Sequence, residues 1–143
     1  MVRLNSAARD LIESGRLAHL VTINANGSPQ VSGIWVGLDG DVLVSGHLQP
    51  QQLKMRNMVR DPRVVLSFET PGRDPSGFTQ YLVVHAEVRL TDGGAPELLH
   101  ELAQTYIGTG TAFPPMPDPP PGVVAHYRIT KITGMGDWSE QGD

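Results

Sequence analysis

The residues best suited to chemistry follow a short apolar run near the middle of the chain. Ser45 and Gly46 end that run, and Lys54 and Asn57 lie on a predicted helix that begins after Pro50. A strand end that bears a hydroxyl, the unpaired N–H groups of a helix start and a cation together suit a phosphate group. Lys54 and Asn57 also fall within one sector of about 100° on a helix, so they can face one ligand.

Each of these features also has a purely structural explanation. Lys54, Arg56 and Arg60 can form a solvated basic face, and their spacing does not distinguish this from a ligand site. Trp35, on a predicted strand, and Trp138, in the tail, can each wall a planar ligand or pack in the core. The sequence alone leaves both alternatives open.

Several other kinds of site are excluded by the residues that the chain lacks. It has no Cys, so disulfides, thiolate metal sites and thiol nucleophiles are ruled out. It has neither a phosphate-binding Gly-x-x-x-x-Gly-Lys-Ser/Thr loop nor a Gly-x-Ser-x-Gly elbow, and its Gly134-Met135-Gly136 lacks a third Gly and lies near the chain end. The five His never stand three or four residues apart, so no metal site is expected.

The length and composition predict one globular domain over residues 1–143. Hydrophobic residues make up 39% of the chain, and 16 Gly and 12 Pro indicate many turns. A net charge of −4 gives no overall attraction to nucleic acid. No apolar run is long enough for a signal peptide or a membrane span, so we expect a cytoplasmic protein with neither nucleic-acid nor membrane partners.

Hydrophobic periodicity predicts three short helices, over residues 7–12, 51–60 and 98–106. It predicts six strands, over residues 17–24, 30–37, 42–45, 64–69, 80–90 and 123–133. Turn signals at Asn26-Gly27 and Asp39-Gly40 predict that the first three strands form an antiparallel meander. The fold is therefore expected to be mainly β, a small closed barrel with short helices, with a flat sandwich as the alternative.

Three motifs give the chain a family resemblance that extends over residues 9–138. They are Lys54-x-Arg-Asn-x-x-x-Asp-Pro-Arg63, Gly27-x-Pro-Gln30 and Gly134-x-Gly-x-Trp138. The chain resembles the pyridoxamine 5′-phosphate oxidase-like split β-barrel family, specifically its branch of deazaflavin (coenzyme F420)-dependent oxidoreductases. It departs from that branch at Gln51 and Gln52, where relatives often have a basic residue, and at Asp137, where Pro is common. The resemblance implies a homodimeric, six-stranded, antiparallel split β-barrel with cofactor sites between subunits.

The resemblance also implies which residues contact the cofactor. Lys54 and Asn57 would hold its phosphate, Arg56 would reach the acidic polyglutamyl tail of F420, and Trp138 would approach the ring from the partner subunit. By position, the phosphate end would also be lined by Ser45, Gly46 and His47, and the ring by Gln30, Val31, Ser32, Gly33 and Ile34.

The activity implied by the resemblance is hydride transfer from reduced F420 to a flat, unsaturated small molecule. The cofactor carries this chemistry, so no catalytic side chain is assigned, although His47 or a water molecule is a candidate proton donor. The substrate would lie in a pocket bordered by Trp35, Trp138 and the proline-rich residues 113–122. Two alternatives stay open: an FMN-dependent oxidase or reductase, and a non-catalytic carrier of flavin, deazaflavin or haem.

Overall fold

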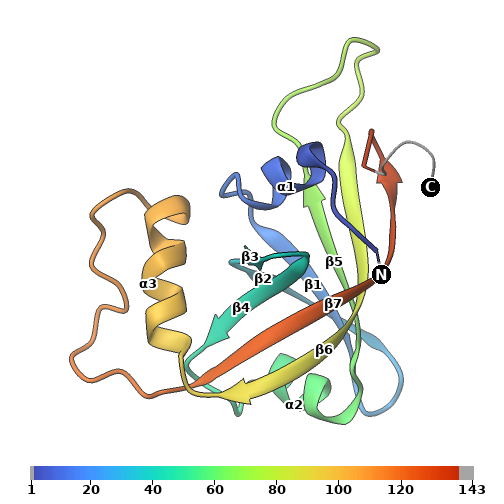
Figure 1. Ribbon diagram of the computed structural model, residues 1–143. Helices are drawn as coiled ribbons and strands as arrows, with labels where there is room; N and C mark the ends of the chain where they lie inside the picture. Colours follow the sequence, from blue (N-terminus) through green and yellow to red (C-terminus); the bar gives the residue numbers. More distant parts are fainter. Residues whose placement is uncertain (1, 139–143) are drawn as a thin grey trace.

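The computed structural model describes residues 2–138, which form one seven-stranded antiparallel sheet and three helices (Figure 1). The helices are α1 (Ser6–Ile12), α2 (Leu53–Arg60) and α3 (Ala95–Tyr106). The strands are β1 (Ala18–Ile23), β2 (Pro29–Ile34), β3 (Gly37–Asp39), β4 (Val42–His47), β5 (Arg63–Glu69), β6 (Tyr81–Asp92) and β7 (Val123–Met135). No helix within residues 2–138 combines the length and the apolar character needed to cross a bilayer.

The sheet corrects two predictions about the first strands. The predicted strand 30–37 is two strands, β2 and β3, so the sheet has seven strands rather than six. The predicted meander is wrong, because β2 pairs with β1 at one edge of the sheet while β3 pairs with β4 at the other. Trp35 and Val36 are the two residues between β2 and β3, so the backbone crosses from one edge of the sheet to the other within two residues. The local pattern gives no sign of this crossing, because Trp35 and Val36 continue the apolar run of β2.

The crossing shows that the sheet curls into a barrel that stays open along one seam. Ile34 and Gly37 are three residues apart, so the ends of the two edge strands lie within about 11 Å of each other. In the strand order of the described chain, β2 and β3 are nevertheless the two ends of the sheet and do not pair. The expected full closure is therefore wrong, whereas a mainly β, antiparallel sheet with short helices, consistent with a split barrel, is confirmed.

The inner face of the curled sheet forms the core. The alternation predicted for the long strand is confirmed, since Leu82, Val84 and Ala86 on β6 are buried. Tyr127 on β7 is the largest fully buried side chain. At the end of the barrel near α2, Met55 and Met58 contribute to the same core. Figure 1 shows α1 and α2 near opposite ends of the barrel.

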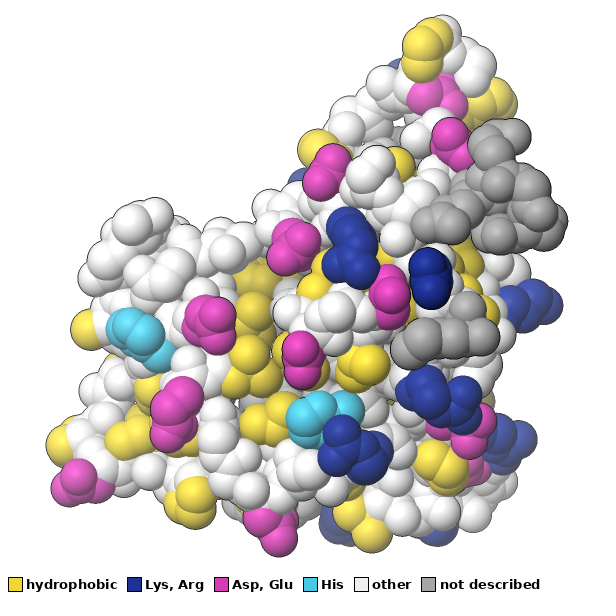
Figure 2. All heavy atoms as spheres, in the orientation of Figure 1, with side chains coloured by type: hydrophobic (Ala, Val, Ile, Leu, Met, Phe, Trp, Pro, Cys, Tyr) yellow, Lys and Arg dark blue, Asp and Glu magenta, His cyan; other side chains and the backbone are white. Residues whose placement is uncertain are grey.

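Helix α3 lies against the outside of β4 and is held there by close packing. A Cβ atom at Gly46 would lie 3.1 Å from both the Ala95 carbonyl oxygen and Leu99 Cγ, so the helix can approach this closely only over glycine. The Tyr106 hydroxyl accepts a 3.0 Å hydrogen bond from the Val36 N–H, which joins the helix to the β2–β3 crossing. Figure 2 shows apolar side chains along the groove between α3 and the sheet.

Candidate functional site

A cavity of about 340 Å³ opens where the seam of the barrel meets α2 and α3. This volume lies near the lower end of the range for small-molecule sites. The cavity brings together five of the residues predicted to bind the cofactor, Gly33, Ile34, Gly46, His47 and Lys54. Its other lining residues are Leu17, Trp35, Leu48, Gln49, Gln52, Leu99 and Phe113.

The lining includes an apolar, aromatic wall built around Trp35. The Trp35 ring stacks on Tyr106 with a centroid distance of 5.4 Å and an angle of 14° between the planes. Phe113 lies tilted against the same indole, with its ring centroid 5.1 Å away. Leu17, Ile34, Leu48 and Leu99 add to the apolar lining. Trp35 is thus fixed by its neighbours. It borders the pocket together with Phe113 of the proline-rich segment, as expected, whereas Trp138, which was expected beside them, does not line the pocket.

The polar lining contains Lys54 and the start of α2. Lys54 is half-buried, and this burial lowers the pKa of its ammonium. Gln52, the N-cap of α2, makes no side-chain capping hydrogen bond. The first N–H groups of a helix have no partner within the helix and carry partial positive charge. Lys54 and the uncapped helix start therefore make this part of the pocket suitable for an anion.

His47 lines the pocket and is neutral at pH 7. Its ring is buried, and this burial, together with the positive charge of Lys54, lowers its pKa to about 4. Its Nε2 atom lies 2.7 Å from Ser45 Oγ, and Ser45 Oγ lies 2.8 Å from the Tyr127 hydroxyl. Burial also raises the pKa of Tyr127. A neutral imidazole is a poor general acid, so the expectation that His47 protonates the product does not fit this environment.

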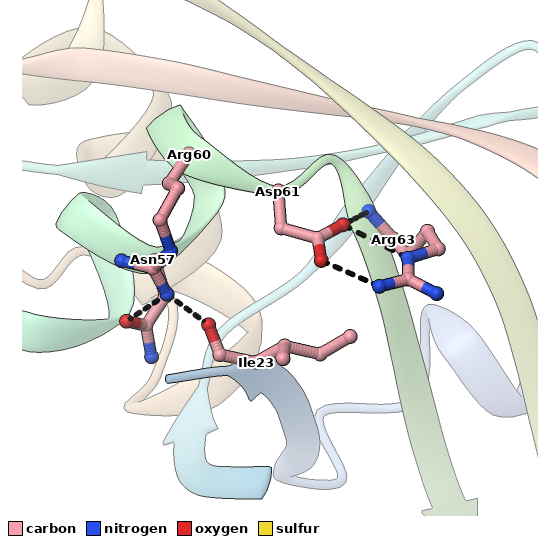
Figure 3. A network of polar contacts seen from close by, with 5 residues as sticks. All are labelled: Ile23, Asn57, Arg60, Asp61 and Arg63. Atoms are coloured by element: carbon pink, nitrogen blue, oxygen red, sulfur yellow. Dashed lines mark hydrogen bonds and ion pairs between the residues drawn. The ribbon is translucent and has the colours of Figure 1, made fainter. Parts of the chain in front are cut away.

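Asn57 lies outside the pocket and connects α2 to β1. It is fully buried, and its amide nitrogen donates hydrogen bonds to Thr22 Oγ1 at 3.1 Å and to Asn24 Oδ1 at 2.9 Å. Its side-chain oxygen, Oδ1, accepts a hydrogen bond from the Arg60 guanidinium, which also donates to the Ile23 backbone carbonyl (Figure 3). Both amide protons are thus used within the protein. The structure assigns Asn57 to holding the helix in place rather than to the expected contact with a phosphate.

The end of the same motif forms a turn between α2 and β5. The Asp61 carboxylate accepts hydrogen bonds from the Arg63 backbone N–H at 3.1 Å and from its guanidinium at 3.0 and 2.7 Å (Figure 3). These bonds are the main reason that the pKa of Asp61 falls to about 2. Of the family-like run from Lys54 to Arg63, only Lys54 lines the pocket, whereas Asn57, Asp61 and Arg63 hold the local structure together.

Other predicted contacts also lie outside the pocket lining. Arg56 is exposed on α2, two residues and therefore about 200° around the helix from Lys54. Ser45 is fully buried behind His47. Gln30, Val31 and Ser32 lie on the edge strand β2 but do not border the cavity. They also alternate between faces, since Val31 is exposed whereas Gln30 lies opposite the buried Thr22.

Trp138 packs against its own subunit, away from the pocket. It is 6% exposed, and its Nε1–H donates a 2.9 Å hydrogen bond to the Tyr81 carbonyl. A Cβ atom at Gly136 would lie 2.4 Å from the indole, and one at Gly134 would lie 2.2 Å from the Tyr81 carbonyl oxygen. The Gly-x-Gly-x-Trp motif therefore has a structural explanation: the glycines let the tail fold the indole against β6.

Sequence reasoning did not single out several residues that shape the site: Leu17, Leu48, Gln49, Leu99 and Tyr127. Leu99 belongs to the apolar stripe noted for the third helix, and this stripe was the available signal for it. Tyr127 follows Val123 and Ala125 on β7 at a spacing of two, which on a strand indicates one buried face. Neither signal shows that the residue lies beside a pocket or contacts one of its lining residues.

Comparison with solved structures places this architecture among known proteins. An F420 reductase aligns with 87% of this chain and 94% of its own, at 27% identity and a TM-score of 0.69. A conserved hypothetical protein, Rv2991 of Mycobacterium tuberculosis, aligns at 19% identity and a TM-score of 0.69 over 94% of this chain and 86% of its own. An FMN-binding protein from Syntrophomonas wolfei aligns at 17% identity and a TM-score of 0.64 over 90% and 84%. The last two show the fold alone.

Sequence comparison identifies the family. No curated protein gives a significant match. The family model described as pyridoxamine 5′-phosphate oxidase, however, matches residues 4–136, which is nearly the whole described chain. This match agrees with the split-barrel topology and with the solved structures above. The chain therefore belongs to the pyridoxamine 5′-phosphate oxidase family, whose members include oxidoreductases.

Proposed function

We propose that this protein is an F420-dependent oxidoreductase that transfers a hydride from the reduced deazaflavin to a flat, unsaturated small molecule. The observation that carries the proposal is the combination of Lys54 and the uncapped start of α2 with an aromatic wall in one pocket. F420 has a planar deazaflavin ring system and a phosphate, so it needs both features. The F420 reductase that aligns at 27% identity supports the same cofactor.

In this proposal the chain's residues bind and orient, while the bound deazaflavin supplies the hydride. Lys54 and the first N–H groups of α2 hold the phosphate. Residues Gln30 to Ile34 of the edge strand β2 run along the ring and offer backbone groups that no neighbouring strand pairs within residues 2–138. The aromatic wall of Trp35 and Phe113 holds the substrate against the ring and excludes water.

The pocket is too small for the whole cofactor, so the rest of it extends over the surface and towards a second subunit. Arg56, exposed on α2, is free to meet the acidic tail there. A homodimer is supported by the outer face of the sheet, where Val31 is 60% exposed and an open groove of about 570 Å³ is lined partly by Val21, Ile23 and Val65. In such a dimer, the tail of the partner subunit would make the contact with the cofactor ring that is expected of Trp138.

The proposed dimer predicts that the protein sediments as a homodimer at micromolar concentration. Replacing Val31 with Asp should shift the protein towards monomer, because the exposed apolar side chain becomes a charge that association would bury. Sedimentation velocity measures this shift, and Glu97→Ala, at an exposed position on α3 outside the groove, is the control. A wild-type protein that is monomeric at tens of micromolar would contradict the dimer.

The experiment that tests the cofactor is a pair of fluorescence titrations, one with F420 and one with FMN. We expect tighter binding of F420, with a dissociation constant that rises with salt because its tail is anionic. Arg56→Ala should weaken F420 binding by up to about fivefold, the size of an exposed ion pair, and should leave FMN binding unchanged. Tenfold tighter binding of FMN would instead favour an FMN-dependent enzyme.

A non-catalytic carrier is the second candidate function. It is favoured by the neutral state of His47, which leaves Lys54, assigned here to the phosphate, as the other titratable group that lines the pocket. The two functions differ in turnover: an enzyme oxidises reduced F420 when a suitable unsaturated acceptor is added. Failure of every compound in a broad acceptor panel, with F420 binding intact, would support the carrier.

A further inference from the structure

The interior of the barrel contains a chain of three polar side chains that ends at the pocket. Tyr127 on β7 and Ser45 on β4 have no exposed surface, and His47 is 6% exposed. The Tyr127 hydroxyl, Ser45 Oγ and His47 Nε2 follow one another at 2.8 and 2.7 Å. Polar groups in an apolar core are costly unless they are hydrogen-bonded, and a satisfied chain of this kind fixes its members in place.

The acidities of the three groups indicate which way the protons point. A phenol is a better donor than an alcohol, and an imidazole nitrogen is the best acceptor of the three. Tyr127 therefore donates to Ser45, and Ser45 donates to His47 Nε2. In the opposite direction the Tyr127 proton would have only Met58 Sδ, 4.0 Å away, which is a weak acceptor. The favoured direction leaves the single ring proton of neutral His47 on Nδ1.

The Nδ1 atom of His47 is open to the pocket. The hydrogen bond of His47 to Ser45 uses Nε2, and across residues 2–138 no buried side-chain nitrogen or oxygen lacks a partner. Nδ1 must therefore reach the surface, and the surface that His47 lines is the pocket. Lys54 lines the same pocket, and its positive charge acts on His47. An N–H group beside an ammonium suits an anion.

We propose that Ser45 and Tyr127 are positioning residues that hold His47 in its Nδ1–H form, and that this N–H joins Lys54 in binding the phosphate group of the ligand. The identity of that ligand as F420 rests on the proposed function. The orientation of His47 does not, because it follows from the chain of hydrogen bonds alone. The phosphate can come from the cofactor or from free phosphate, and the two are tested separately.

Nuclear magnetic resonance of the ligand-free protein, with ¹⁵N-labelled histidine at pH 7, tests the tautomer. We expect His47 to show a protonated Nδ1 and an unprotonated Nε2. Tyr127→Phe keeps the ring but removes the first donor, and Ser45→Ala removes the link, so both should increase the Nε2–H form. His126, whose Nε2 lies 2.9 Å from Thr91 Oγ1, is the internal control and should not change. An Nε2–H form of His47 in the wild-type protein, or a tautomer unchanged in both variants, would overturn the proposal.

Binding is tested by adding inorganic phosphate and F420 in separate titrations. Each should shift the His47 Nδ1 signal, and Tyr127→Phe should weaken F420 binding by about three- to tenfold, as expected for one hydrogen bond. Thermal unfolding identifies any variant whose loss of affinity reflects loss of fold. If phosphate moves His47 but F420 does not bind, the proposed function fails while this inference stands. If F420 binds without moving the Nδ1 signal, this inference fails while the proposed function stands.

Discussion

The free energy of unfolding is expected to fall by about 3 kcal/mol as the pH is lowered from 7 to 4, because His47 is buried as a neutral ring. Its pKa is about 4 in the folded protein and 6.5 for the free side chain. Between these values the unfolded chain binds a proton that the folded chain rejects. The stability that depends on neutral His47 is therefore fully present above pH 6.5 and is lost as the pH falls towards 4. Below pH 4, the titration of His47 changes the stability little.

Urea unfolding at a series of pH values measures this loss, and His47→Gln is the matched variant. Glutamine keeps a neutral hydrogen-bonding side chain beside Ser45 but does not titrate, so its stability should be much flatter between pH 6.5 and 4. Asp61 titrates lower, since its pKa of about 2 lies below the ordinary 3.8, and contributes only below the His47 range. Parallel losses in the wild-type protein and in His47→Gln would show that His47 is not the cause.

The strands were predicted well where burial alternates along the chain, and poorly where pairing depends on distant residues. The alternation in β6 is local, because one face packs in the core and the other does not. The break at Trp35 and Val36 is not local. It arises because the curled sheet brings its two edges together, and Tyr106, seventy residues further along, holds Val36 in place. A sequence window around Trp35 contains neither cause.

The candidate site shows the same division. Helical spacing correctly places Lys54 and Asn57 on neighbouring parts of α2, but it does not reveal what packs against each. Asn57 meets Thr22 and Asn24 of the first hairpin, whereas Lys54, at the start of the helix, meets the pocket. One motif can likewise combine residues that bind a ligand with residues that hold the fold. Only the contacts made by each side chain separate the two kinds.

Replacing Lys54 with Ala is expected to weaken F420 binding by about 1.5–3 kcal/mol, which corresponds to about 10- to 150-fold in the dissociation constant. The loss is large because the ammonium is half-buried in the pocket. Without it, a phosphate bound there would keep its negative charge but lose its cationic partner. The fold should stay intact, since no hydrogen bond or ion pair within residues 2–138 uses the Lys54 ammonium. Fluorescence titration measures the affinity, and urea unfolding measures the stability.

Asn57→Ala is the contrasting variant on the same helix. It removes both donors to Thr22 and Asn24 and the acceptor for Arg60, so it should lower the free energy of unfolding by about 1–3 kcal/mol. Binding of F420 to the protein that stays folded should change little, because the Asn57 amide does not line the pocket. Two results would reverse this assignment: an unchanged dissociation constant in Lys54→Ala, or a stable Asn57→Ala protein that has lost its affinity. Either result would move the phosphate from Lys54 towards the buried amide.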